Sequence, residues 1–183
     1  MKRPNRLYPM TMTAAMAAAL AVVSPFALPI GPVPLSLCTL VIGLSAYVLG
    51  WRRGTAAVLV YVLLGAAGMP VFGGFTGGLG RVLGPTGGYI LGYLPLAALT
   101  GAAVERFPGR RLPQMLGMVL GTGALYALGT AWYCFQSGVA PSAALAACVL
   151  PFLPGDGVKL AVLLAMGPAI RSRLSEAGLL IQK

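Results

Sequence analysis

Only one apolar stretch of the chain carries an acid and a base together. It spans residues 154–159 and reads PGDGVK. Positions i and i+3 lie on one face of a helix, so the carboxylate of Asp156 and the ammonium of Lys159 reach the same small volume. Charges inside a membrane span cost at least about 2.5 kcal/mol each and usually face the bundle interior. Two interpretations stay open: an ion pair that only neutralises itself and joins two helices, or the polar patch of a ligand site.

A glycine-rich segment over residues 73–89 is the second candidate, with eight glycines in seventeen residues. Glycine permits close approach to the backbone, whose N–H and C=O groups then face a ligand. Flexible linkers are poor in aromatic residues, so Phe75 and Tyr89 favour a binding segment over a floppy connection. Arg81 either meets an anionic group at the mouth of a pocket or simply lies at the lipid headgroups.

The residue types that are missing exclude several classes of function. The chain has no His, and its only acids are Asp156, Glu105 and Glu176. Cys38, Cys134 and Cys148 show no C-x-x-C spacing, so we expect no metal site and no enzyme built on paired carboxylates or His. No G-x-x-x-x-G-K-[ST] occurs, so the chain has no ATP-binding loop of its own, and we expect no cofactor.

Composition places these residues in a membrane. Of 183 residues, 58% are apolar and 9% are charged, against about 25% charged in soluble domains. The net charge of +10 comes from small basic clusters between apolar runs. A nucleic-acid binder needs one continuous basic face, whereas clusters of this kind flank membrane spans and contact lipid headgroups. We therefore predict an all-α integral membrane protein and no nucleic-acid partner.

Proline, glycine and arginine divide the chain into six predicted transmembrane helices within a single membrane domain, 1–183. The helices are expected over residues 9–25, 35–50, 54–69, 84–104, 112–135 and 151–170. The second and third are shorter than the roughly 20 residues of a straight span, so a kink or a buried position is expected for them. Residues 140–150 are apolar but too short to cross, and are interpreted as an interfacial or re-entrant element.

The basic residues predict the orientation. With six crossings, eleven of the thirteen Lys and Arg residues fall on the side that holds both termini. An excess of Lys and Arg marks the cytoplasmic side, so both termini are predicted to be cytoplasmic. Segment 73–89 and Asp156 then lie toward the outside. We expect the extended, proline-rich segment 25–34 to lie outside as well, where it would form a wall or a cap of the predicted ligand pocket.

Small residues line the first helix. Ala14 with Ala18, and Ala15 with Ala19, are spaced four apart, and such residues let membrane helices approach closely. Packing within the chain's own bundle and docking to another subunit are both open.

Four motifs follow one another along the chain: IGPVPL at 30–35, GMPVF at 68–72, GPTGGY at 84–89, and PGD at 154–156 followed by Lys159. In this order they resemble the BioY family, the biotin-binding S components of energy-coupling factor (ECF) transporters. The resemblance implies an ECF S-component-like bundle in a bacterial cell membrane, with an outward-facing biotin pocket and uptake rather than export. The residues that match the family's binding segments are Asp156, Lys159, Phe75, Gly77, Gly78, Thr86, Gly87, Gly88 and Tyr89.

The resemblance also implies partners, namely a membrane-embedded T subunit that meets the alanine face of the first helix, and two cytoplasmic ATPase subunits. Biotin enters as the transported substrate and not as a cofactor. Two alternatives are kept: an S component for another vitamin-sized solute, and a structural or assembly subunit that binds no small molecule.

Overall fold

The computed structural model describes residues 7–28, 33 and 35–176. Over these residues the chain forms helices and one two-stranded antiparallel ribbon, in which Ala27 pairs with Ser36 and Leu28 with Leu35. The elements are α1 (Leu7–Val23), β1 (Ala27–Leu28), β2 (Leu35–Ser36), α2 (Cys38–Ala66), α3 (Leu79–Val82), α4 (Gly87–Arg106), α5 (Arg111–Ser137), α6 (Pro141–Cys148) and α7 (Leu153–Glu176).

Helix α2 is two limbs that fold back on each other at Gly50. Gly50 has φ +76° and ψ −173°, which are not helical values and which glycine adopts without strain. A Cβ at Gly54 would lie 3.1 Å from the Cα of Ala46, whereas residues eight apart in one straight helix are about 12 Å apart. The two limbs, 38–49 and 51–66, therefore correspond to the expected second and third helices.

The reversal at Gly50 is held from α4. Glu105 accepts a hydrogen bond from the backbone N–H of Trp51 through Oε1, at 3.1 Å. This amide is one of the unpaired donors at the start of the second limb, where a carboxylate is favoured by the helix dipole. A side chain on Gly50 would collide with the same carboxylate. Glu105 therefore has a structural task, far from the predicted ligand site.

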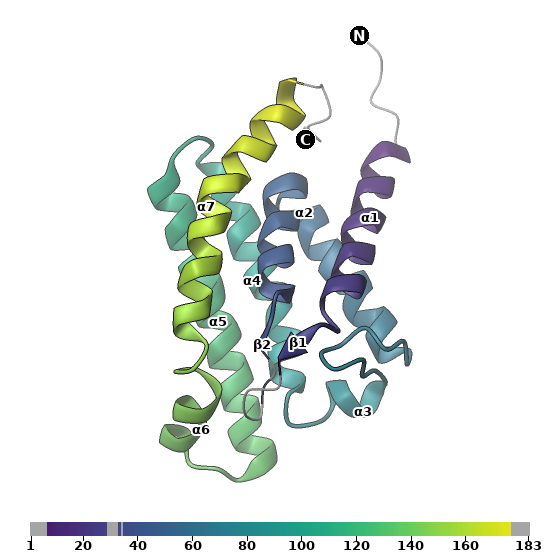
Figure 1. Cartoon of the computed structure of the whole chain (residues 1–183), viewed down its shortest axis with the longest axis vertical. Helices are drawn as coiled ribbons and strands as arrows, with labels where there is room; N and C mark the ends of the chain where they lie inside the picture. The colour runs from purple at the N-terminus through teal and green to yellow at the C-terminus, as the bar shows by residue number, and fades with distance from the viewer. Residues whose placement is uncertain (1–6, 29–32, 34, 177–183) are drawn as a thin grey trace.

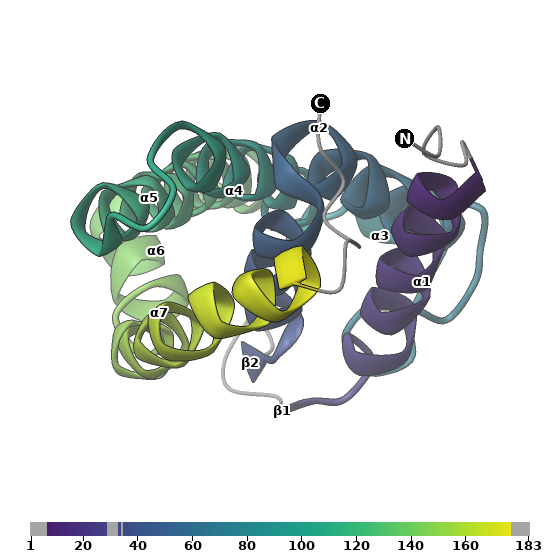
Figure 2. The same ribbon diagram turned by 90° about the horizontal axis from the view of Figure 1, so that it is seen from above.

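The long helical segments run between two ends of the bundle (Figure 1). One end, which we call the basic end, holds the start of α1, the Gly50 turn, the α4–α5 connection and the end of α7. Its described basic residues are Arg52, Arg53, Arg106, Arg110, Arg111, Arg171 and Arg173. The other end, the loop end, holds β1, β2, α3 and α6. Seen from above, α1 lies at one side and α4 and α5 at the other, with α2 between them and α7 alongside α2 (Figure 2).

Apolar side chains lie both inside the bundle and on its outer surface. The main core cluster lies between α2, α4 and α5 and includes Tyr61, Phe72, Ile90 and Leu96. Helix α5 exposes Leu116, Leu120 and Leu128 on its outward face, as helices do in contact with lipid. Helices α2, α4, α5 and α7 are long and apolar enough to cross a membrane, and α1 is a shorter apolar helix of 17 residues.

The observed bounds differ modestly from the expected ones. Helix α7 continues to Glu176 rather than ending at residue 170, and α4 begins at Gly87 rather than residue 84. Residues 140–150 contain the short helix α6, at the loop end. The described residues exclude the N-terminal cluster Lys2, Arg3 and Arg6, half of the proline-rich segment 25–34 (residues 29–32 and 34), and Lys183.

Close contact between backbones makes Gly101 a sensitive position. A Cβ there would lie 2.5 Å from the Cα of Trp51, so Gly101→Ala forces α4 away from α2. We expect it to lower the free energy of unfolding by about 1–3 kcal/mol, measured by denaturation in detergent.

Gly123→Ala is the matched control, because Gly123 is an exposed helical glycine of α5 and a Cβ added there would have no other atom within 4 Å. The new methyl group should raise the free energy of unfolding by about 0.5–1 kcal/mol. Equal effects of the two substitutions would contradict the close packing of α2 against α4.

Candidate functional site

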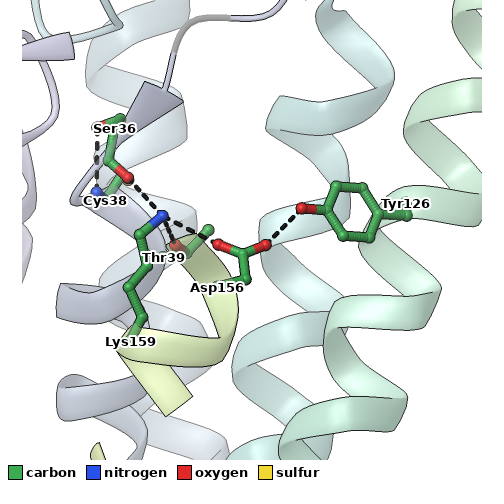
Figure 3. Close-up of polar contacts among 6 residues, drawn as sticks. All are labelled: Ser36, Cys38, Thr39, Tyr126, Asp156 and Lys159. Carbon is green, nitrogen blue, oxygen red and sulfur yellow. Dashed lines mark hydrogen bonds and ion pairs between the residues drawn. The ribbon is translucent and has the colours of Figure 1, made fainter. Parts of the chain in front are cut away.

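Asp156 and Lys159 lie in the first turns of α7, beside the connection from α6. The sequence supports this start, because Pro154 is tolerated in a first helical turn, where its missing N–H is not needed. The Asp156 side chain is 12% exposed and that of Lys159 is 13% exposed. Lys159 Nζ lies 3.0 Å from Asp156 Oδ1 (Figure 3). The helix dipole favours a carboxylate at this position.

All three ammonium protons of Lys159 have acceptors. Nζ donates to the carbonyl oxygen of Ser36 at 2.8 Å, to Thr39 Oγ1 at 3.0 Å and to Asp156 Oδ1 at 3.0 Å. Ser36 belongs to β2 and Thr39 to the first turn of α2. Figure 3 shows Lys159 reaching from α7 toward both. The charged group therefore fastens α7 to the loop end of α2.

The second oxygen of Asp156 is bound from the opposite side. Tyr126, on α5, donates its hydroxyl proton to Asp156 Oδ2, and Figure 3 shows the phenol pointing at the carboxylate. We call Ser36, Thr39, Tyr126, Asp156 and Lys159 the polar junction. It draws on β2, α2, α5 and α7. The carboxylate oxygens keep lone pairs that a ligand can use, whereas Lys159 reaches a ligand only by giving up one of its three present acceptors.

Two adjoining cavities meet at the loop end. Both are lined by Val33, Ser36, Tyr89 and Tyr93. The first extends past Phe72 and Gly73 to Arg81 and Thr86. The second extends past Tyr126, Cys148 and Phe152 to Asp156 and Lys159. We call the two together the substrate cleft. Its walls are aromatic. The opposite charges of Asp156 and Lys159 lie at one end, and the guanidinium of Arg81 lies at the other.

The structure brings part of the predicted set to this cleft. Tyr89, Thr86, Arg81, Asp156 and Lys159 line it. The glycines predicted as binding residues lie elsewhere and serve close packing: a Cβ at Gly77 would meet the backbone of Met69, one at Gly87 that of Val82, and one at Gly88 the side chain of Trp132. Gly78, with φ +94°, precedes α3 and has no atom near a Cβ position.

Phe75 lies at the rim and not in the cleft. Its side chain is 60% exposed and packs edge-on against Phe26, with ring centroids 5.3 Å apart. Its φ of +57° is unusual for a residue other than glycine. The neighbouring Gly74 donates its N–H to the carbonyl of Pro25 at 2.9 Å. The segment after α1 and the glycine-rich segment are therefore joined at the loop end.

Helix α5 fixes the other side of the glycine-rich segment. Trp132 Nε1 donates to the carbonyl of Gly84 at 2.9 Å, and Gln136 Nε2 to that of Leu83 at 2.6 Å. The hydroxyl of Tyr89 is 3.0 Å from that of Thr130. These contacts position Thr86 and Tyr89 against the cleft, so the segment is an ordered wall.

Some residues of the site carry no signal in the sequence. Tyr126, Ser36 and Thr39 were not expected there, because each lies in a part of the chain distant from Asp156 and Lys159. Tyr93 and Cys148 lie near predicted residues in the sequence, but neither residue type is conspicuous in an apolar helix. Burial raises the pKa of the Cys148 thiol, which keeps it neutral. Among the described residues no group of three or more His, Cys, Asp or Glu side chains is placed to hold a metal ion.

Most of the alanine face of α1 is exposed on the described chain. Ala14, Ala15 and Ala18 are exposed and Ala19 is half-buried, while Ala17 and Leu20 point into the bundle. The neighbour against which α1 packs is α2. The sequence leaves open whether the small residues of α1 pack within the bundle or dock to another subunit. Packing within the bundle explains the burial of Ala17, but it does not explain small residues at the exposed positions Ala14, Ala15 and Ala18.

Comparison with known proteins gives consistent matches. The sequence profile of the BioY family matches residues 1–176. Biotin transporter BioY2 of Lactococcus lactis subsp. cremoris is 37% identical over 171 residues, 93% of this chain and 94% of that protein. Biotin transporter BioY of Rhodobacter capsulatus is 41% identical over 150 residues, 74% of this chain and 78% of that protein.

A solved structure shares the fold. It is the S-component for biotin from an ECF-type ABC transporter, which matches with a TM-score of 0.85 and 27% identity over 94% of this chain and 95% of that one. The resemblance found in the sequence motifs is thereby confirmed, as is the all-helical bundle of the S-component type. The apolar helices and these matches together identify a multi-pass membrane protein.

The contact between Tyr126 and Asp156 generates a stability prediction. Tyr126→Phe removes the donor and leaves a buried carboxylate oxygen unpaired, so the free energy of unfolding should fall by about 1.5–3 kcal/mol. Thermal or chemical denaturation in detergent measures this.

Tyr133→Phe provides the comparison on the same helix. Tyr133 packs against the core, and its hydroxyl makes no hydrogen bond within the described part of the chain. That substitution should change the free energy of unfolding by less than about 0.5 kcal/mol. If Tyr126→Phe is equally neutral, Tyr126 does not hold the carboxylate.

Proposed function

Since this chain belongs to the BioY family, we propose that it is the biotin-binding membrane subunit, or S component, of an ECF-type vitamin uptake transporter. The relatives it matches are named biotin transporters, and the solved structure that shares its fold is an S-component for biotin. The observation that carries the proposal in this chain is the substrate cleft, in which the polar junction lies against aromatic walls.

The chemistry of the cleft suits biotin. The ureido group of biotin has two N–H donors and a carbonyl acceptor, which a carboxylate and an ammonium match. Asp156 Oδ1 and Oδ2 each keep a lone pair that can accept a ureido N–H, and Lys159 Nζ can donate to the ureido carbonyl once it exchanges one of its three present acceptors for the ligand. Tyr89, Tyr93 and Phe152 offer apolar surface to the bicyclic body. We assign Arg81, at the far end of the cleft, to the carboxylate of the valeryl chain.

The remaining predicted residues support the site indirectly. Phe75 closes the rim with Phe26, and Gly77, Gly78, Gly87 and Gly88 shape the glycine-rich wall. A ligand therefore contacts Thr86, Tyr89 and Arg81 from this segment, in addition to Asp156 and Lys159.

Six helical segments cross the bacterial cell membrane in this proposal: α1, the two limbs of α2, α4, α5 and α7. The basic end faces the cytoplasm, because seven arginines of the described chain lie there. The substrate cleft, at the loop end, then faces outward, and the ends of α1 and α7 that lead to the two termini are cytoplasmic.

The chain is proposed to work with other subunits and not as an enzyme. Its sequence holds no ATP-binding loop, so the energy for accumulation comes from two cytoplasmic ATPase subunits through a membrane-embedded T subunit. The face formed by Ala14, Ala15 and Ala18 supports the T subunit as the neighbour of α1, because small exposed residues allow close helix approach.

Biotin binding to the purified protein tests the proposal. Asp156→Asn and Lys159→Met each leave the partner charge unpaired in a buried site, so each should weaken biotin affinity about 30-fold or more in isothermal titration calorimetry. A melting curve without ligand is needed for both variants, because the polar junction also joins α7 to its neighbours and either substitution can destabilise the protein. Weaker binding then counts only for protein that is folded.

Glu176→Gln is the matched control for that experiment. It breaks another i,i+3 ion pair of α7, with Arg173 at 3.8 Å, whose side chains are 86% and 68% exposed for Arg173 and Glu176. Its biotin affinity should equal that of the wild type. If the wild type binds no biotin but binds another vitamin in the same calorimetric experiment, the cleft is assigned to that solute. If it binds none of a panel of vitamins, an assembly subunit is favoured.

Labelling of introduced cysteines tests the orientation. In a background where the three native cysteines are replaced by Ala, Ser142→Cys at the loop end should react with a membrane-impermeant maleimide in intact cells. Ser172→Cys at the basic end should react only after permeabilisation. Both serines are exposed, so the reverse pattern would show that the cleft faces the cytoplasm.

A further inference from the structure

A separate cavity lies on the other side of the polar junction, toward the basic end. Asp156, Lys159 and Thr39 border it at the junction, and Thr100, Thr122 and Met118 line it beyond. We call it the inner cavity. Asp156 and Lys159 thus stand between this cavity and the substrate cleft, because they line both.

The inner cavity contains a polar group that the protein does not satisfy. Thr100, on α4, is fully buried at 0% exposure. Its Oγ1 has no hydrogen-bond partner among the described residues. A buried hydroxyl without a partner is destabilising, so such groups are almost always bonded to protein or to water.

The other polar groups of the inner cavity have hydrogen-bonding capacity to spare. Thr39 Oγ1 accepts a hydrogen bond from Lys159 Nζ, and this contact leaves its own hydroxyl hydrogen available for donation. The hydroxyl of Thr122 is a third such group. A buried water needs two to four polar partners and is not held by a purely apolar cavity. Three hydroxyls beside an ion pair meet that need.

We propose that the inner cavity is a buried hydration site, in which water bonds to Thr100 and Thr39 behind the Asp156–Lys159 pair, and which the substrate does not enter. The water solvates the junction from the side opposite the cleft. When a ligand exchanges contacts with Asp156 and Lys159 on the cleft side, the two charged groups therefore keep polar neighbours on the side of the inner cavity. The hydration site itself does not depend on biotin being the substrate.

Radiolytic hydroxyl-radical footprinting of the wild-type protein tests for the water directly. Radicals formed from bound water oxidise the side chains next to it, and Met118 lines the inner cavity while being only 2% exposed. After correction for intrinsic reactivity, we expect Met118 to be oxidised well above the buried core residue Leu20 in the wild type, and no more than Leu20 in Thr100→Val. Saturating biotin should leave the oxidation of Met118 unchanged. The proposal is overturned if Met118 in the wild type is oxidised no more than Leu20, or if biotin protects Met118 completely.

The sign of a melting-temperature shift gives an independent test. Thr55, on α2, also has a buried hydroxyl without a partner among the described residues, but it lines none of the three cavities. Thr55→Val should therefore raise the Tm, because it removes an unsatisfied group. Thr100→Val should lower the Tm by about 2–4 °C, because the water loses a partner.

Thr100→Ser keeps the hydroxyl and should melt within about 1 °C of the wild type. A Tm for Thr100→Val equal to or above that of the wild type would mean a dry cavity and would overturn the proposal. These melting temperatures are measured without ligand, so they test the hydration site even if biotin fails to bind. A failure of the proposed function and a failure of the hydration-site proposal are therefore distinguishable.

Discussion

The structure depends on a buried ion pair that is fully hydrogen-bonded. Removing an ammonium and a carboxylate from water is costly, and their attraction compensates only when their remaining protons and lone pairs are also used. Here Lys159 has three acceptors, and Asp156 is bound by Lys159 on one oxygen and by Tyr126 on the other. These partners come from β2, α2 and α5. The charges are therefore satisfied only when α7 has docked on all three, so docking of this helix and assembly of the site are one event.

The pair itself could be predicted from the sequence, but its surroundings could not. An acid and a base one helical turn apart in an apolar run are conspicuous because lipid makes them costly. Tyr126, Ser36 and Thr39 are not conspicuous, since tyrosine, serine and threonine occur in apolar helices without any such role. They lie 30 to 123 residues from their partner in the chain. Only the folded structure shows which of them meets the charges.

The glycines illustrate a related limit. Their density marked the segment 73–89 as special, and it does form a wall of the cleft. Composition alone does not distinguish a glycine that exposes backbone to a ligand from one that admits a neighbour. Gly88 lies against Trp132, and Gly77 against Met69. The approximate places where helices begin and end could be predicted because arginines, glycines and prolines divide the apolar runs. The reversal at Gly50, by contrast, is fixed by a contact with Glu105, on another helix.

The edge-to-face contact of Phe26 with Phe75 has a kinetic consequence. It joins the segments before β1 and after Phe72, and both segments supply residues to the cleft, Ser24 from one and Gly73 from the other. The hydrogen bond from Gly74 to Pro25 ties the same two segments. A movement of either segment alone breaks both contacts. If the cleft holds a ligand as proposed, opening it toward the loop end therefore costs these two contacts, and the aromatic pair would slow release without touching the ligand.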